Sequence, residues 1–194
     1  MRRFHFRAWA AVLAVVLIAA LPAGATTVLQ MNLEGLCDGA AQIFRGTVLR
    51  IDETRVTAGG GEIPALRYTV RVDEALKGQF QTVKGVPIAE ILVVGTLKQH
   101  AAGRPPIAGF PLLQEGREYL LMVAPAGPVG LTATMGLGQG CFTLAGKPGE
   151  ETAVNGFNNN GLFAGMTVPG MPASGPVSYA ALASMIQGIV GGGQ

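Results

Sequence analysis

The chain has 194 residues, of which 49% are hydrophobic and only 13% are charged. This apolar composition with so few charges excludes an intrinsically disordered chain. The 29 glycines and 12 prolines interrupt any long helical pattern, which excludes a coiled coil or helix bundle and favours short strands joined by turns.

The first 25 residues predict an export signal peptide. Arg2, Arg3 and Arg7 precede an uncharged apolar run at residues 8–21, and small residues follow at 22–25. The run is shorter than the roughly 20 apolar residues that cross a bilayer, so we expect cleavage after Ala25 rather than a membrane anchor. The arginine pair matches a twin-arginine signal only in part, which favours general secretion. We therefore expect a secreted or periplasmic protein without membrane insertion.

Removal of this segment reverses the charge balance. Three of the 14 basic residues are lost with the signal peptide, which leaves 11 against 12 acidic residues and a formal charge of −1. No basic tract remains, so neither nucleic acid nor an anionic membrane surface is expected as a partner.

Both cysteines, Cys37 and Cys141, follow the signal peptide. An exported chain meets an oxidising compartment, so we predict a disulfide between them. The bridge would close a loop of about 100 residues and stabilise the fold by roughly 4–5 kcal/mol in the chain-entropy model. The alternative is a pair of buried free thiols, which behave as small apolar side chains.

Six short apolar runs predict strands. They lie at residues 43–51, 66–72, 88–94, 117–123, 131–135 and 141–144. The run at 66–72 alternates strictly between apolar and polar residues, so one of its faces is expected to be buried. A short helix is predicted to begin after Asn32, a capping residue, and a further hairpin is predicted within residues 152–163.

Two long connections separate these strands, at residues 53–65 and 95–116. The second is too interrupted by proline and glycine to predict a helix. Rigid barrels present recognition on their longer connections, so a partner is expected to be held by residues 53–65 and 95–114. The candidate partner-binding residues are Gly59, Gly60, Gly61, His100, Arg104, Pro105 and Pro106.

The last 43 residues, from Thr152 on, contain no Asp, Glu, Lys or Arg. A helix is predicted after the cap Ser178, because Tyr179, Leu182 and Ile186 fall on one stripe. Such a tail would be poorly soluble on its own, so it is expected to pack on the rest of the domain. The alternative is an exposed patch that binds a partner.

No residue pattern predicts catalysis, a metal site or a cofactor. None of the three serines lies in a Gly-x-Ser-x-Gly sequence, and His100 is the one histidine after the signal peptide. A zinc site needs three or four ligands, and a Cys37–His100 nucleophile pair is disfavoured because bridged or buried cysteines explain the thiols better. The neighbouring acidic residues are expected to be solvated strand ends, and the Gly-rich stretch at 136–141 a strand connection. We expect a protein that is not an enzyme.

Three stretches carry a resemblance to a known family: residues 43–48, residues 66–78 with their Lys-Gly turn, and residues 115–121 with Gly-x-x-Tyr-Leu-Leu. They resemble strands one, two and four of the netrin-like and tissue-inhibitor-of-metalloproteinase (TIMP) branch of the oligonucleotide/oligosaccharide-binding (OB) fold. The similarity covers residues 41–144. It implies a mainly-β fold, a small antiparallel OB-like barrel with a short N-terminal helix and a C-terminal helix.

This resemblance implies a barrel domain at residues 26–146 and a Gly- and Asn-rich extension at 147–194 whose helix packs on it. In the inhibitor branch an N-terminal cysteine chelates the zinc of a protease. Here the expected mature chain begins at Thr26 and the first cysteine lies eleven residues later. No binding residue of the family is therefore carried over.

The hypothesis that combines these features is an exported, non-enzymatic binding module that engages a protein partner through barrel loops, with a secreted protease as one candidate. The alternative is an envelope or surface structural component whose apolar tail mediates assembly. Solution state separates the two, because the first fits a monomer with a soluble partner and the second fits self-association.

Overall fold

The computed structural model describes residues 29–192. The predicted signal peptide at 1–25 and the expected new N-terminus at Thr26 lie outside these residues. No helix within the described residues is both long and apolar enough to cross a membrane.

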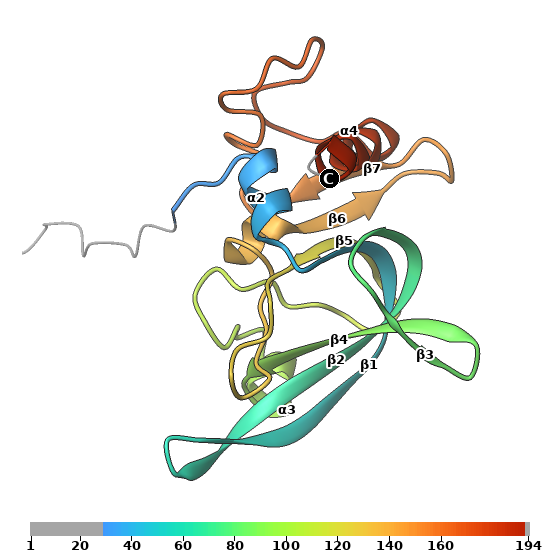
Figure 1. Ribbon diagram of the computed structural model, residues 1–194. Helices are drawn as coiled ribbons and strands as arrows, with labels where there is room; N and C mark the ends of the chain where they lie inside the picture. Colours follow the sequence, from blue (N-terminus) through green and yellow to red (C-terminus); the bar gives the residue numbers. More distant parts are fainter. Residues whose placement is uncertain (1–28, 193–194) are drawn as a thin grey trace, which may run out of the picture.

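Within residues 29–192, eight strands form one antiparallel sheet in the order β3-β4-β2-β1-β5-β6-β7-β8. Figure 1 shows how the strands from β3 to β7 lie in the molecule. The strands are β1 (Gln42–Ala58), β2 (Gly61–Lys77), β3 (Gln81–Val83), β4 (Val86–Val94), β5 (Glu118–Val123), β6 (Cys141–Ala145), β7 (Thr152–Asn155) and β8 (Val177–Ser178). The predicted mainly-β fold with helices near both ends of the chain is confirmed.

The sheet is strongly curved but is not closed into the expected barrel. The predicted strand at 131–135 makes only an isolated bridge, between Val123 and Thr134. On its other side Thr132 N donates to Leu92 O at 2.7 Å, so this segment spans the gap between β5 and β4 with few hydrogen bonds. Prolines precede the segment and glycines lie on both sides of it, which disfavours a longer ladder.

In the described part of the chain three α-helices accompany the sheet: α2 (Leu33–Gly39), α3 (Leu97–Ala101) and α4 (Tyr179–Gly192). As predicted, α2 begins after Asn32, whose Oδ1 accepts from Gly35 N at 2.9 Å. Helix α3 was not predicted. It forms because Thr96 and Gln99 make a capping box, which nucleates one turn despite the prolines that follow.

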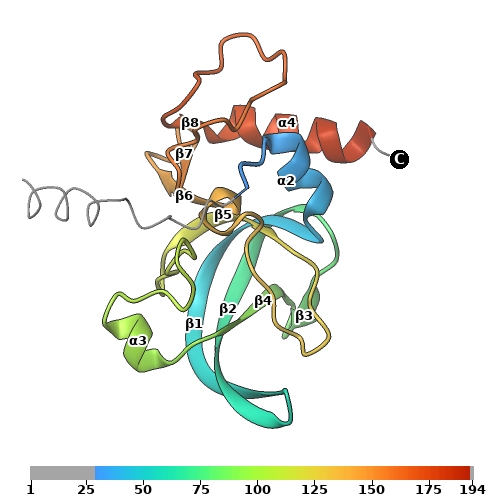
Figure 2. The ribbon, with the colours of Figure 1, turned by 90° about the vertical axis from the view of Figure 1, so that its left-hand side faces the viewer.

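The prediction of a loop at 53–65 is wrong, because β1 and β2 both extend into this segment. The ladder between β1 and β2 continues to the Ala58–Gly61 pair. The turn is only Gly59 and Gly60, whose φ angles of +61° and +82° suit a two-residue hairpin turn. The hairpin projects from the rest of the molecule in two perpendicular views, Figures 1 and 2.

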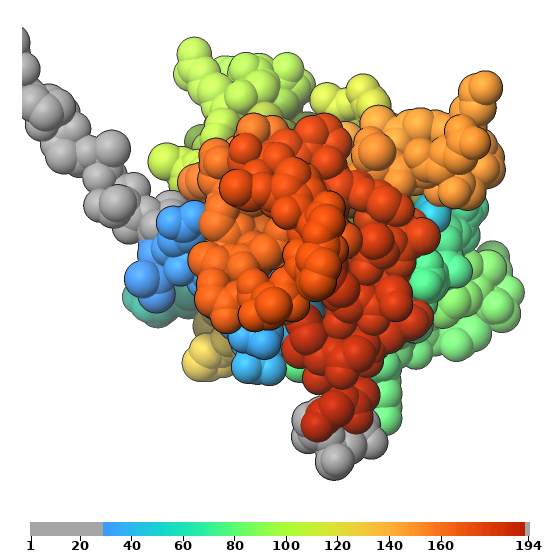
Figure 3. Space-filling view, turned by 90° about the horizontal axis from the view of Figure 1, so that it is seen from above, coloured from blue at the N-terminus to red at the C-terminus, as the bar shows by residue number. Residues whose placement is uncertain are grey.

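Strand β5 and the start of β1 are buried on both faces, whereas β2 alternates between buried and more exposed side chains. Along β5, Leu120 and Met122 belong to one apolar cluster, whereas Tyr119, Leu121 and Val123 belong to another. The first, which we call the helix-covered cluster, lies between the sheet and the two helices α2 and α4. The second, which we call the concave cluster, fills the concave side of the sheet. The residues after β7 and helix α4 cover the first face, as Figure 3 shows from above.

The predicted disulfide between Cys37 and Cys141 is not present. Both thiols are free and buried. Cys37 belongs to the helix-covered cluster and Cys141 to the concave one, so the sheet separates them. Burial raises the pKa of both thiols to about 12, which keeps them protonated and unreactive at neutral pH.

We therefore expect that the native protein does not react with a thiol reagent such as DTNB at neutral pH. Unfolding in denaturant without a reductant should expose two reactive thiols, and one in the Cys141→Ala variant. A chain that shows no reactive thiol until a reductant is added would contain the disulfide and contradict this structure.

Candidate functional site

The two predicted partner-binding segments lie side by side. We call residues 53–65 the arm and residues 95–114 the flank. Leu97 N in the flank donates to Glu53 Oε2 in the arm at 2.8 Å, and Gly95 N donates to Pro64 O at 3.0 Å. The stem of the arm is thus joined to the flank, while a Cβ at Gly59, Gly60 or Gly61 would meet nothing within 4 Å.

The flank is anchored from beneath by two apolar side chains. Phe110 and Leu113 are 4% and 0% exposed and belong to the concave cluster. His100 also turns inward, with its Nε2 2.8 Å from Leu113 O and its ring centroid 5.9 Å from that of Tyr68. His100 therefore supports the flank, whereas Arg104 and Pro105 are exposed.

Apolar side chains are also exposed at this end of the molecule. Leu97 and Ile107 in the flank are 42% and 51% exposed, and Val94 at the end of β4 is 38% exposed. Pro106 lies against Gly95, where an added Cβ would come within 3.3 Å of the proline ring. An anchored segment that exposes apolar side chains beside a projecting hairpin is a surface suited to a protein partner.

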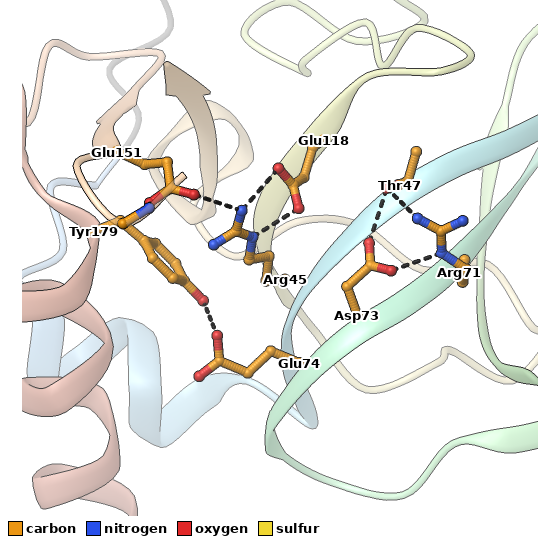
Figure 4. A network of polar contacts seen from close by, with 9 residues as sticks. Arg45, Thr47, Arg71, Asp73, Glu74, Glu118, Glu151 and Tyr179 are labelled. Carbon is orange, nitrogen blue, oxygen red and sulfur yellow. Dashed lines mark hydrogen bonds and ion pairs between the residues drawn. The ribbon is translucent and has the colours of Figure 1, made fainter. Parts of the chain in front are cut away.

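A second polar site lies where β1, β5 and β7 approach helix α4, shown in Figure 4. We call Arg45, Glu74, Glu118, Glu151 and Tyr179 the Arg45 cluster. The Arg45 guanidinium donates from Nε and Nη2 to Glu118 at 2.7 and 3.0 Å, and from Nη2 to Glu151 at 3.0 Å. Its Cζ lies 4.8 Å from the centre of the Tyr179 ring, and the Tyr179 hydroxyl donates to Glu74 at 2.5 Å.

These contacts set the charge state of the cluster. The hydrogen bond to Glu118 is the main cause that raises the pKa of Arg45. Hydrogen bonds from its own backbone N–H and from Arg45 lower the pKa of Glu151. Burial, with the hydrogen bond to Glu74 second, raises the pKa of Tyr179. At neutral pH Arg45 is therefore a cation, the Glu151 carboxyl is ionised and the Tyr179 phenol is neutral.

The Arg45 cluster fastens the C-terminal helix rather than forming a reactive site. Tyr179 is the first residue of α4, and its backbone N–H donates to Glu151 O at 2.9 Å. The Arg45 guanidinium hydrogen-bonds to two carboxylates, so its charge is balanced within the cluster. Beyond it, Thr47, Arg71 and Asp73 form a separate exposed group of hydrogen bonds, also visible in Figure 4.

Sequence reasoning missed the Arg45 cluster, since it interpreted the acidic pairs that include Glu74 and Glu151 as solvated strand ends. Its members come from five separate parts of the chain. The sequence did carry one indication. Arg45 lies two residues from the apolar Ile43, so both side chains point to the same face of β1, and this is the face that α2 and α4 cover. The partners of Arg45 could not be read from the sequence.

A groove of about 540 Å³ runs between the end of α2 and the end of α4. Lys77 lines it, and the Lys77 ammonium donates to Cys37 O at 2.7 Å, at the C-terminal end of α2. Within residues 29–192 no three His, Cys, Asp or Glu side chains gather as a metal site would require. No family model matches the chain, and no curated protein is significantly similar to it.

The lowered pKa of Glu151 predicts a specific acid sensitivity. The ionised Glu151 carboxylate stabilises the folded protein fully when the pH is above the ordinary carboxyl pKa of about 4.3, which applies to the unfolded chain. This stabilisation is lost as the pH falls through the lower pKa that Glu151 has in the folded protein. In Glu151→Gln, we expect the melting temperature to fall less steeply than in the wild type as the pH is lowered through this range.

Glu150→Gln is the matched control, because Glu150 is exposed and makes no salt bridge within the described part of the chain. Its melting temperature should follow the wild-type pH dependence. Equal acid slopes for Glu151→Gln and the wild type would show that the Arg45 contact does not hold the carboxylate ionised.

Proposed function

We propose that this chain is an exported, non-enzymatic binding module that engages a protein partner through the arm and the flank. The observation that carries the proposal is the joining of these two segments at one end of the sheet by the Leu97–Glu53 and Gly95–Pro64 hydrogen bonds. The buried Phe110 and Leu113 hold the flank in place, so little ordering entropy is lost on binding.

The surface chemistry supports a protein as the partner. The exposed Leu97 and Ile107 provide apolar contact area, and the arm adds charged side chains at Glu53, Arg55 and Glu62. An apolar centre with a polar rim is typical of protein interfaces. A secreted protease is the partner that the netrin-like resemblance suggests, and both the resemblance and the export remain predictions.

The alternative function, assembly through an exposed apolar tail, has less support. Phe163, Met166 and Met171 of the tail pack against the helix-covered cluster. Leu162 and Val177, 1% and 3% exposed, are members of that cluster. Apolar residues that already cover the sheet are not free to join another molecule.

Capture of a partner from the secreted fraction, with the exported chain as bait, tests the proposed function. Removing residues 56–57 and 62–63 shortens the arm by about 7 Å and keeps the alternation of its side chains, because two residues leave each strand. This variant, and the double variant Leu97→Ser, Ile107→Ser, should lose capture with nearly unchanged melting temperatures.

Val83→Ser is the control, because Val83 is 53% exposed on β3, away from the arm; Figure 1 shows this separation. It should retain capture. If both the shortened-arm variant and the flank variant still captured the same protein, the partner would bind elsewhere and the proposed site would be wrong.

A further inference from the structure

The outer edge of β1 along the arm has no strand beside it. β1 pairs with β5 only through residues 42–47, whereas it pairs with β2 as far as Ala58. Among residues 29–192 no strand therefore pairs with the outer side of β1 from residue 52 to 58. An unpaired edge presents a row of backbone N–H and C=O groups to another strand.

The hydrogen-bond pattern shows which backbone groups face outward. Gly95 N donates to Pro64 O, so the Pro64 carbonyl points away from β1. In an antiparallel ladder the residue opposite Pro64, Arg55, then also directs its N–H and C=O away from β2. The same parity applies two residues away on either side, at Glu53 and Thr57.

A contact nearer the base of the arm supports this alternation of outward and inward backbone groups. Ile51, two residues before Glu53, donates its N–H to Glu115 Oε1 at 2.8 Å. A carboxylate oxygen of Glu115 thus occupies the place that a strand carbonyl would take. Beyond Ile51, the outward groups of Glu53 and Arg55 have no backbone partner in the described part of the chain.

The β1 edge lacks the features that usually prevent strand pairing. The opposite edge of the arm carries Pro64, which has no N–H to donate. β1 has no proline in the arm, and its register shifts all precede Arg50, so the ladder from residue 50 to 58 is regular. A regular edge without proline or bulge is open to a further strand.

The charged side chains on this edge can pair with those on the same edge of a second copy of the chain. Glu53 and Arg55 are exposed and point to the same face of β1, being two residues apart. Asp52 is already paired with Arg50 at 2.6 Å, whereas Arg55 makes no salt bridge within residues 29–192. Glu53 Oε2 accepts from Leu97 N of the flank, so the carboxylate meets a further cation through its other oxygen. The edge therefore offers one carboxylate oxygen and one basic side chain on the same face.

We propose that two copies of this chain pair antiparallel along the β1 edge, in a register centred on Thr54. Glu53 of one protomer then lies opposite Arg55 of its partner, and the two-fold axis repeats the contact. The outward backbone groups of both residues meet as hydrogen-bonded pairs. A register centred on Arg55 would instead bring two arginines together.

This dimer goes beyond the proposed function, because its occupant is a second copy of the chain, and it replaces the monomer expected of the binding module from the sequence. It covers Glu53 and Arg55 on the β1 side of the arm, so a protein partner would bind through Glu62, the hairpin tip at 58–61 and Ile107 of the flank. The contact is isologous, so it closes at two copies instead of growing into a filament. It differs in this way from assembly through the tail.

Sedimentation velocity over a range of concentrations tests the proposal, with the chain expressed from its complete N-terminus and purified after export. The wild type should show a monomer–dimer equilibrium. Arg55→Glu turns two attractive pairs into two repulsive ones and should raise the dimer dissociation constant roughly tenfold or more. Arg55→Pro should do the same, because it removes an outward N–H without removing a hairpin hydrogen bond.

The double variant Glu53→Arg, Arg55→Glu restores opposite charges in the same register and should dimerise again, even though it also removes the hydrogen bond from Leu97 N to Glu53. Arg104→Glu is the control, since it makes the same charge change at an exposed residue that is outside β1 and makes no salt bridge within residues 29–192, and it should dimerise like the wild type. Thermal melts followed by circular dichroism confirm that each variant is folded. A wild type that stays monomeric at every concentration, or an Arg55→Glu variant that dimerises equally well, would overturn the proposal.

Discussion

Burial of both faces of the sheet around β5 is the constraint on which the rest of this structure depends. Strand β5 has buried side chains at every position from Tyr119 to Val123, so neither face can remain in water. At about 25 cal/mol per Å² of apolar surface, leaving one face exposed would cost more than a small domain can tolerate. The concave face is filled by side chains of the sheet itself and of the flank. The other face is covered by α2 and by the C-terminal region with α4.

The need to cover this face explains the unusual composition of the C-terminal region. A segment of 43 residues without a charged side chain would be insoluble in isolation, but here it lies over the sheet with Leu182 and Ile186 of α4 fully buried. The Arg45 cluster marks the border where this cover ends. On one side of Arg45 lies the apolar cluster beneath α4, and on the other the exposed group around Asp73.

The sequence predicted the elements that have a strong local signal. The alternation at 66–72 identified β2, and the cap Asn32 identified the start of α2. It failed where the outcome depends on distant residues. The glycines at 59–61 and the polar residues around them indicated a loop, whereas pairing across the hairpin extends both strands to a two-residue turn. The cysteine count predicted a disulfide, but the count cannot tell that a sheet lies between the two thiols.

The candidate site was predictable in the same limited way. The sequence indicated that two segments would face a partner, and the structure joins them through Leu97 and Glu53. It could not indicate that His100 would turn inward onto Tyr68, because that contact depends on how the flank folds over the concave cluster. The unpaired β1 edge was equally hidden, since it exists only once β5 is seen to leave β1 at residue 47.

Native-state hydrogen exchange, measured by mass spectrometry at increasing denaturant, tests most directly whether the tail and the sheet are one cooperative unit. If the two faces depend on each other, amides in the centre of α4 and in β5 will open with the same free energy, while those at the tip of the arm exchange quickly. If instead α4 exchanges like an unstructured peptide while β5 stays protected, the tail is not the cover that the sheet requires.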